Sequence, residues 1–248
     1  MLSRWPGKLM VALIWLAIWQ LAAHLIALPV LLPGPGLTLV TLWQLAGDGA
    51  FWLSLVFSLL RIMLGYLLAL LVGTALGLLC AAWPLAEALL SPLRTLIRST
   101  PVSSFIILVL LWLPIGHVPL FIAGLTVLPI VWLSVQHGIA EVDKGLMEMT
   151  RAYQFGRWKR MRHLYAPSVL PYFAAAASTG LGFAWKAGIA AEVIARPLQS
   201  IGRNLQDAKV YLQTDRLFAW TLVVILLSIA LEKLLRRTVP LLRRGRKP

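Results

Sequence analysis

Apolar runs long enough to cross a lipid bilayer constrain the fold of this chain more than any other feature. The hydrocarbon core of a bilayer is about 30 Å thick, so a helix needs about 20 apolar residues to cross it. Such runs alternate with short polar or basic intervals along the sequence. The chain is 60% hydrophobic and 13% charged, whereas soluble domains are about one-quarter charged. With so few charges for a polar coat, the chain is expected to have lipid as its main solvent.

The predicted fold is all-α and polytopic, with about six transmembrane helices. The first apolar run follows Arg4 and Lys8. It is longer than the core of a secretory signal, and no small-residue cleavage pattern follows it. Ser99-Thr100-Pro101 is expected to break a helix, so that the third span starts there and residues 85–98 stay on the cytoplasmic side. The expected spans cover residues 9–28, 51–82, 102–113, 119–136, 168–189 and 217–235.

The distribution of basic residues predicts the orientation. With both termini in the cytoplasm, 17 of the 23 Lys and Arg residues fall on the cytoplasmic side and four fall outside. An excess of this sign is typical of cytoplasmic loops. One membrane domain is expected over residues 1–248, with a core at about 50–238. No internal repeat is evident, which argues against a secondary carrier built from inverted repeats.

The longest polar interval, residues 141–171, predicts a surface structure between two spans. It carries Lys144, Arg151, Arg157, Lys159, Arg160 and Arg162. Apolar residues recur at spacings of three and four on both sides of Gly156, which predicts two short amphipathic helices around a break. Such a segment offers an apolar ridge to a partner. The alternative is a basic loop held at the membrane by anionic lipid.

This interval resembles the cytoplasmic coupling loop of bacterial ABC importer permeases, the EAA-loop family. Glu148, Met149 and Thr150 stand at the Glu-Ala-Ala positions, and Leu164 and Pro167 stand at the Ile and Pro positions. Gln154 replaces the family glycine, with Gly156 two residues later, and Ala166 replaces a leucine. Residues 31–35, 61–77, 98–101 and 186–202 also resemble this family. The resemblance covers roughly residues 30–240 and is strongest to the branch that handles nitrate, sulfonates, taurine and some thiamine precursors.

The resemblance implies a bacterial inner-membrane permease subunit that is not itself an enzyme. Two copies, most simply a homodimer, would sit on two ABC ATPase subunits that bind ATP and Mg²⁺, and an extracytoplasmic solute-binding protein would deliver the solute. The coupling loop would span about 138–167 and dock on the ATPase. The residues expected to make that coupling are Glu148, Met149, Thr150, Tyr153, Gly156, Trp158, Leu164 and Pro167.

No pattern in the sequence points to catalysis or to a cofactor on this chain. There is no phosphate-binding Gly-rich loop, and the four histidines are too scattered for a zinc site, so no metal is expected. Nucleic acid is not expected as a partner either, because the basic residues are explained by membrane topology. A membrane-embedded enzyme would need clustered acids, whereas the nine acidic residues are dispersed.

Charged residues at membrane depth are the candidates for the solute path, because charges there are costly unless they have a role. Arg61, Lys186 and Glu192 are the three candidates. Arg61 and Lys186 together would suit an anionic solute. The alternative is structural, in which both cations extend to the interface or Lys186 pairs with Glu192.

Overall fold

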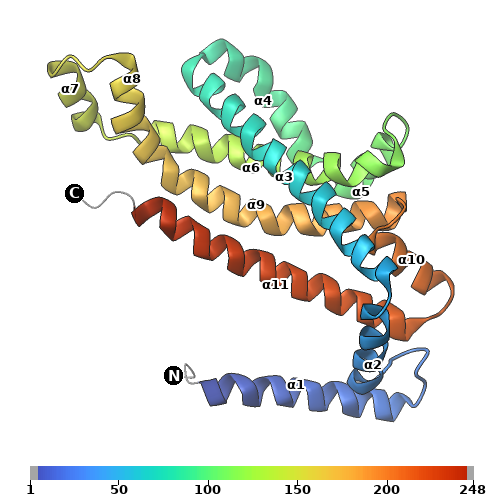
Figure 1. The fold of residues 1–248 in the computed structure, drawn as a ribbon. Coiled ribbons are helices and arrows are strands. Elements are labelled where there is room, and N and C mark those ends of the chain that lie inside the picture. Colours follow the sequence, from blue (N-terminus) through green and yellow to red (C-terminus); the bar gives the residue numbers. More distant parts are fainter. Residues whose placement is uncertain (1–4, 245–248) are drawn as a thin grey trace.

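A computed structural model describes residues 5–244 of the chain, and every regular element within this range is a helix (Figure 1). Arg4, Arg246 and Lys247, on which the predicted orientation partly depends, lie outside the described residues. The helices are α1 (Trp5–Ile26), α2 (Pro35–Ala46), α3 (Gly49–Ala82), α4 (Pro84–Ser99), α5 (Val102–Val109), the 3₁₀ turn η1 (Ile115–His117), α6 (Val118–Ala140), α7 (Lys144–Ala152), α8 (Arg157–Arg160), the π-helical turn η2 (Met161–Tyr165), α9 (Ala166–Ala195), α10 (Ile201–Val210) and α11 (Thr214–Arg244).

Three helical stretches are long and apolar enough to cross a membrane by length and composition alone. They are Gly49–Ala82, Ile115–Ala140 and Thr214–Leu235. Helix α9 has 30 residues and therefore also has the length, but it is rich in Ala and Gly and carries Lys186 and Glu192. The apolar part of α1, Met10–Ile26, is shorter.

Helices α3 and α6 pack side by side and run in the same direction. A Cβ atom placed on Gly65 would overlap the carbonyl of Leu120, and one on Gly77 would lie 2.8 Å from the carbonyl of Trp132. The residue numbers rise together along both helices, which establishes the parallel direction. Small residues at such contacts let the two backbones approach closely, as they do in membrane helix pairs.

The parallel direction of α3 and α6 requires the chain to return along the bundle between them. That return is made by α4 and α5, which meet at the predicted Thr100-Pro101 break. The expected third span at 102–113 is therefore wrong, because α5 has only eight residues and is about 12 Å long. Residues 85–98, expected as a cytoplasmic segment, form most of α4 and are part of the return.

A polar cluster explains how α4 packs although none of its residues is buried. Arg94 donates hydrogen bonds to both Glu87 carboxylate oxygens, at 2.7 and 3.2 Å, and another to Gln136 of α6 at 2.6 Å. The Arg94 guanidinium also lies over the ring of Trp132, 5.1 Å from its centroid. The charges that made residues 85–98 look like a surface segment thus attach α4 to α6.

Helix α9 lies against both α3 and α6 and runs antiparallel to them (Figure 1). Gly180 faces Val127 of α6, and Gly188 faces Ile62 of α3. Trp185 is buried, and its indole N–H donates a 3.1 Å hydrogen bond to the carbonyl of Val224 on α11. The main apolar core is formed where these four helices meet.

The two ends of the bundle carry different structures. Figure 1 shows the start of α1, the end of α11 and the α7–α8 segment at one end of the molecule. Helices α2 and α10 and the loop before α10 lie at the other end. The surface that the sequence predicts for a partner is therefore far from the segments that connect α1 to α3 and α9 to α11.

Candidate functional site

The predicted coupling segment forms a helical hairpin that protrudes from one end of the bundle. Asp143 caps α7 by accepting a 2.9 Å hydrogen bond from the backbone N–H of Leu146. Helix α7 ends at Ala152 with Tyr153 as its C-cap, and α8 begins after Gly156. Helix α8 continues through the π-helical turn η2 into α9 without an intervening loop. The predicted two short helices around a break at Gly156 are thus present.

The outward face of this hairpin carries large side chains that nothing in the chain covers among the described residues. Tyr153 is 73% exposed and Trp158 is 78% exposed, while Met149 is 45% exposed. Glu148 of α7 is also exposed. We refer to Glu148, Met149, Tyr153 and Trp158 as the docking surface. Exposed aromatic and Met side chains gathered in one place are typical of a protein–protein contact.

Three of the predicted coupling residues lie inside the hairpin instead of on its surface. Thr150 is 3% exposed and Leu164 is 4% exposed, and Pro167 is partly buried in the first turn of α9. Thr150 donates a 2.8 Å hydrogen bond to the carbonyl of Met147, and its own carbonyl accepts from the N–H of Phe155 at 2.9 Å. The hydrogen bonds of Thr150 thus lie within the hairpin, and these three residues are not part of its exposed surface.

Gly156 does not provide the turn that the sequence led us to expect from it. Its backbone angles, φ −60° and ψ 160°, suit any residue, and a Cβ atom there would meet nothing within 4 Å. The left-handed residue of the turn is Gln154, with φ 52°. Gln154 stands where the coupling-loop pattern has glycine. Position 154 thus keeps the left-handed backbone conformation that favours glycine, although its residue is glutamine.

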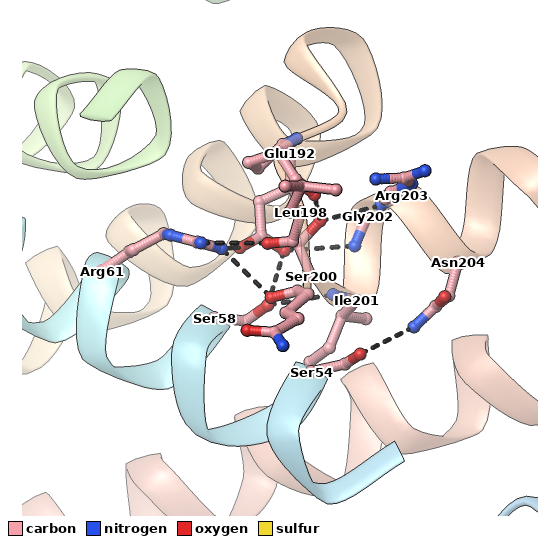
Figure 2. A network of polar contacts seen from close by, with 12 residues as sticks. Ser54, Ser58, Arg61, Glu192, Leu198, Ser200, Ile201, Gly202, Arg203 and Asn204 are labelled. Atoms are coloured by element: carbon pink, nitrogen blue, oxygen red, sulfur yellow. Dashed lines mark hydrogen bonds and ion pairs between the residues drawn. The ribbon is translucent and has the colours of Figure 1, made fainter. Parts of the chain in front are cut away.

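The other candidates, Arg61 and Glu192, meet in a polar network at the opposite end of the bundle (Figure 2). Glu192 is fully buried, and its Oε2 accepts hydrogen bonds from the Ser58 hydroxyl at 2.7 Å and from the Gly202 N–H at 3.1 Å. Its Oε1 lies 3.8 Å from the guanidinium of Arg61.

Arg61 is further occupied by the loop that precedes α10. Its guanidinium donates hydrogen bonds to the carbonyls of Leu198 and Gln199, at 3.0 and 3.2 Å. A cation that is paired with a buried carboxylate and two carbonyls has little capacity left for a solute. The geometry therefore favours a structural role for Arg61 and Glu192, through a pairing that was not among the expected alternatives.

Lys186 is separated from this network. It is exposed, whereas Glu192 is buried, because six residues along a helix place two side chains about 120° apart around its axis. Lys186 instead lines a small cavity with residues of α9 and α11. The structure thus does not bring Arg61 and Lys186 together, and Lys186 does not pair with Glu192.

The hydrogen-bonding partners of Arg61 and Glu192 in this network were not predicted from the sequence. Ser54 and Ser58 are polar residues four apart in an apolar helix, a spacing that could have identified one face of α3 as polar. Ser54 accepts a 3.0 Å hydrogen bond from Asn204, and the Ser58 hydroxyl accepts one from Ile201 N–H at 2.9 Å. The need for glycine at Gly202 became visible only in three dimensions, because a Cβ there would overlap Glu192.

Comparison with known proteins identifies the family. Residues 73–244 match the family described as the binding-protein-dependent transport system inner membrane component. The taurine transport system permease protein TauC of Escherichia coli (strain K12) is 29% identical over 254 residues, covering 96% of this chain and 92% of TauC. The putative aliphatic sulfonates transport permease protein SsuC of the same strain is 31% identical over 233 residues, covering 92% of this chain and 86% of SsuC.

A solved structure supports the same fold. One chain in a crystal structure of an amino acid ABC transporter with histidines has a TM-score of 0.59 at 17% identity, covering 78% of this chain and 94% of that chain. The prediction of an all-α polytopic membrane protein is confirmed, as is the resemblance to importer permeases. This chain belongs to the family of binding-protein-dependent transport system inner membrane components, the membrane-spanning permease subunits of ABC importers.

Proposed function

We propose that this chain forms the solute pathway of an ATP-driven importer for a small sulfonate-like or taurine-like solute. It would act as a single permease domain, pair with a second copy and rest on two ATPase subunits that hydrolyse the ATP. A solute-binding protein outside the membrane would deliver the solute. Relatives whose names specify taurine and aliphatic sulfonates support this solute class.

The observation that carries the proposal is the connection between the docking surface and the bundle. The exposed Tyr153 and Trp158 flank the break between α7 and α8, and α8 runs through η2 directly into α9. Helix α9 in turn packs against α3, α6 and α11. A partner that moves the hairpin would therefore move a central helix of the bundle, as hinge and shear transitions require.

The chemistry of the hairpin suits an ATPase groove. Met149, Tyr153 and Trp158 would supply the apolar contact area. Glu148, exposed on the same surface, would offer a carboxylate to a basic side chain of the ATPase. Thr150 and Leu164 would keep the hairpin rigid, so that force on the surface reaches α9.

The orientation proposed for the chain places the hairpin and both termini in the cytoplasm of a bacterium, in its inner membrane. The six basic residues between Lys144 and Arg162 support this, because cytoplasmic loops carry an excess of Lys and Arg. The same orientation puts the Arg61–Glu192 network and α10 on the outer side, where a solute-binding protein would dock.

Co-purification from gently solubilised membranes tests the proposal. The native chain is expected to retain an ATPase, and the double variant Tyr153→Ala/Trp158→Ala should lose it by at least about 10-fold, because buried aromatic anchors dominate binding energy. Trp43→Ala is the matched control, since Trp43 is 83% exposed and lies on α2 at the other end of the bundle. A native chain that purifies without an ATPase, or a double variant that keeps it, would refute the docking assignment.

Glu148 has its own test in the same complex. Glu148→Gln keeps the size of the side chain and removes its charge, and the residue is exposed, so the thermal unfolding midpoint should not change. ATP hydrolysis stimulated by the solute and its binding protein is expected to fall several-fold. Stimulation equal to that of the native complex would remove Glu148 from the docking surface.

A further inference from the structure

A cavity between α9 and α11 combines two charges of opposite sign with hydroxyl groups. It has a volume of about 270 Å³ and is lined by Ser178, Thr179, Gly182, Phe183, Lys186 and Glu232. This is just below the range of about 300–1,000 Å³ typical of pockets for drug-sized ligands, so it suits a smaller molecule. Ser178, Thr179 and Gly182 lie near the middle of the 30-residue α9.

Neither charge in the cavity has an ion-pair partner among the residues that the structure describes. Arg61, Arg94, Arg196 and Arg203 form the ion pairs in this part of the chain, and Lys186 and Glu232 take part in none. Lys186 lies nine residues before the end of α9, about 13 Å along its axis. Charged side chains at such depth are rare in membrane proteins and mark substrate or ion pathways.

The hydroxyl groups in the cavity are also unused within residues 10–235. Ser and Thr residues in membrane helices usually donate to the carbonyl four residues earlier, and Thr74, Thr126, Ser168 and Thr221 do so here. No such hydrogen bond involves Ser178 or Thr179. Two hydroxyl donors therefore line the same cavity as Lys186, about two turns before it on α9.

We infer that this cavity binds a small zwitterion, with an anionic sulfonate at one end and an ammonium group at the other. This assignment rests on the proposed function and specifies its solute class. Lys186 Nζ would bind the sulfonate and the Glu232 carboxylate would bind the ammonium group, while the hydroxyls of Ser178 and Thr179 would complete the polar lining. A simple anion would satisfy Lys186 but would bring a second negative charge near Glu232, which is unfavourable at low local dielectric.

Phe183 connects the cavity to a second one. Its side chain also lines a cavity of about 330 Å³ formed with α4, α5 and α6, where Arg98, Thr100 and Thr126 contribute polar groups. Phe183 is 49% exposed and is the lining residue that the two cavities share. A solute bound at Lys186 and Glu232 would therefore lie near this second, mainly apolar cavity.

Saturation-transfer difference NMR with the full chain in lipid nanodiscs tests the assignment, because this method measures weak binding. Three probes are used. Taurine carries both charges, ethanesulfonate carries only the negative charge, and ethylammonium carries only the positive charge. Taurine is expected to bind at least about 10-fold more tightly than either of the others. Ethanesulfonate binding as tight as taurine binding, or no binding of any probe, would overturn the assignment.

Variants separate the two charges. Lys186→Met should weaken taurine and ethanesulfonate about equally, by at least about 10-fold, whereas Glu232→Gln should weaken taurine alone. Glu232→Asp keeps the charge and should restore most of the taurine affinity. Lys209→Met, an exposed lysine on α10, is the matched control and should leave all three affinities unchanged. Equal effects of Glu232→Gln on taurine and ethanesulfonate would refute the role of Glu232.

The same preparations distinguish this assignment from the proposed function. If an ATPase remains bound to the chain while no probe binds, the zwitterion site is wrong and the permease role stands. If no ATPase is retained but taurine binds as described, the ATP-driven mechanism is wrong and the site stands.

Discussion

The hydroxyl of Ser58 on α3 donates a 2.7 Å hydrogen bond to Glu192 on α9, a residue 134 positions later in the chain. The same hydroxyl accepts a hydrogen bond from the N–H of Ile201, and the same carboxylate oxygen accepts one from Gly202 (Figure 2). One serine and one glutamate thus join α3, α9 and the start of α10. The end of the bundle far from the docking surface depends on this junction.

Ser58→Ala should destabilise the chain by about 1.5–3 kcal/mol, because it removes a hydrogen bond to a buried carboxylate and leaves the Ile201 N–H without its partner. Equilibrium unfolding by denaturant in detergent micelles measures this. Ser103→Ala is the control, because Ser103 is exposed in the first turn of α5 and should change stability by less than about 0.5 kcal/mol. Equal stability of the two variants would show that the hydrogen bond contributes nothing measurable.

Gly202→Ala is expected to cost about 1–3 kcal/mol by overpacking, because the new methyl group would overlap the Cβ of Glu192 and the backbone N of Val193. Thermal unfolding of the purified chain is a suitable measurement. Gly116→Ala provides the comparison, since a Cβ at Gly116 meets nothing within 4 Å. If the thermal unfolding midpoint of Gly202→Ala equals that of the native chain, the contact between Glu192 and Gly202 must be looser than the structure indicates.

Gln154→Gly should stabilise the turn between α7 and α8, because glycine adopts a φ of 52° without the penalty of about 1–2 kcal/mol that a side chain carries there. Its larger unfolded-state entropy offsets about 0.4–1 kcal/mol of that gain. Slower hydrogen exchange of the amides in residues 150–156 would report the net effect.

Gly156→Ala serves as the opposite comparison within the same turn. Gly156 has ordinary backbone angles and open space around it, so this substitution should not speed exchange. The opposite result would be faster hydrogen exchange in Gly156→Ala and unchanged exchange in Gln154→Gly. It would show that the turn needs glycine at position 156.

Arg94→Met should loosen α4 from α6. The substitution removes three charge-assisted hydrogen bonds and leaves Glu87 with Gln136 alone, at a cost of about 1–2 kcal/mol because Glu87 is partly exposed. Hydrogen exchange along residues 84–99 should rise while that of α6 stays the same. Arg98→Met, on the same helix without an ion pair in the described chain, should leave the exchange of α4 unchanged; equal effects of both variants would refute the cluster's role.

Sequence patterns were sufficient where composition and period determine an element. The long apolar runs predicted α3, α6 and α11, and the spacing of apolar residues such as Met149 and Tyr153 before Gly156 and Trp158 and Met161 after it predicted the hairpin. Sequence patterns failed for α4, because Glu87 and Arg94 look like surface residues in the sequence but form an ion pair with each other in the fold. A 16-residue amphipathic helix followed by a Pro101 break does not have the continuous hydropathy by which spans are recognised.

The position of the candidate site in the chain could be predicted from the sequence. Which of its residues are exposed and which are buried could not. Periodicity cannot separate Thr150, which is buried, from Tyr153, which is exposed, because burial depends on contacts in three dimensions. Likewise, Arg61 and Lys186 are equivalent as charges in apolar runs. Only the fold shows that Arg61 meets Glu192 while Lys186 lies beside Glu232.

The glycine contacts between α3 and α6 limit how the bundle can move. Gly65, Gly73 and Gly77 face the carbonyls of Leu120, Leu128 and Trp132, and each pair is 55 positions apart in sequence. A slide of one helix along the other would bring Cβ atoms into the space that these glycines leave. A switch between open states is therefore expected to leave the register of α3 against α6 unchanged.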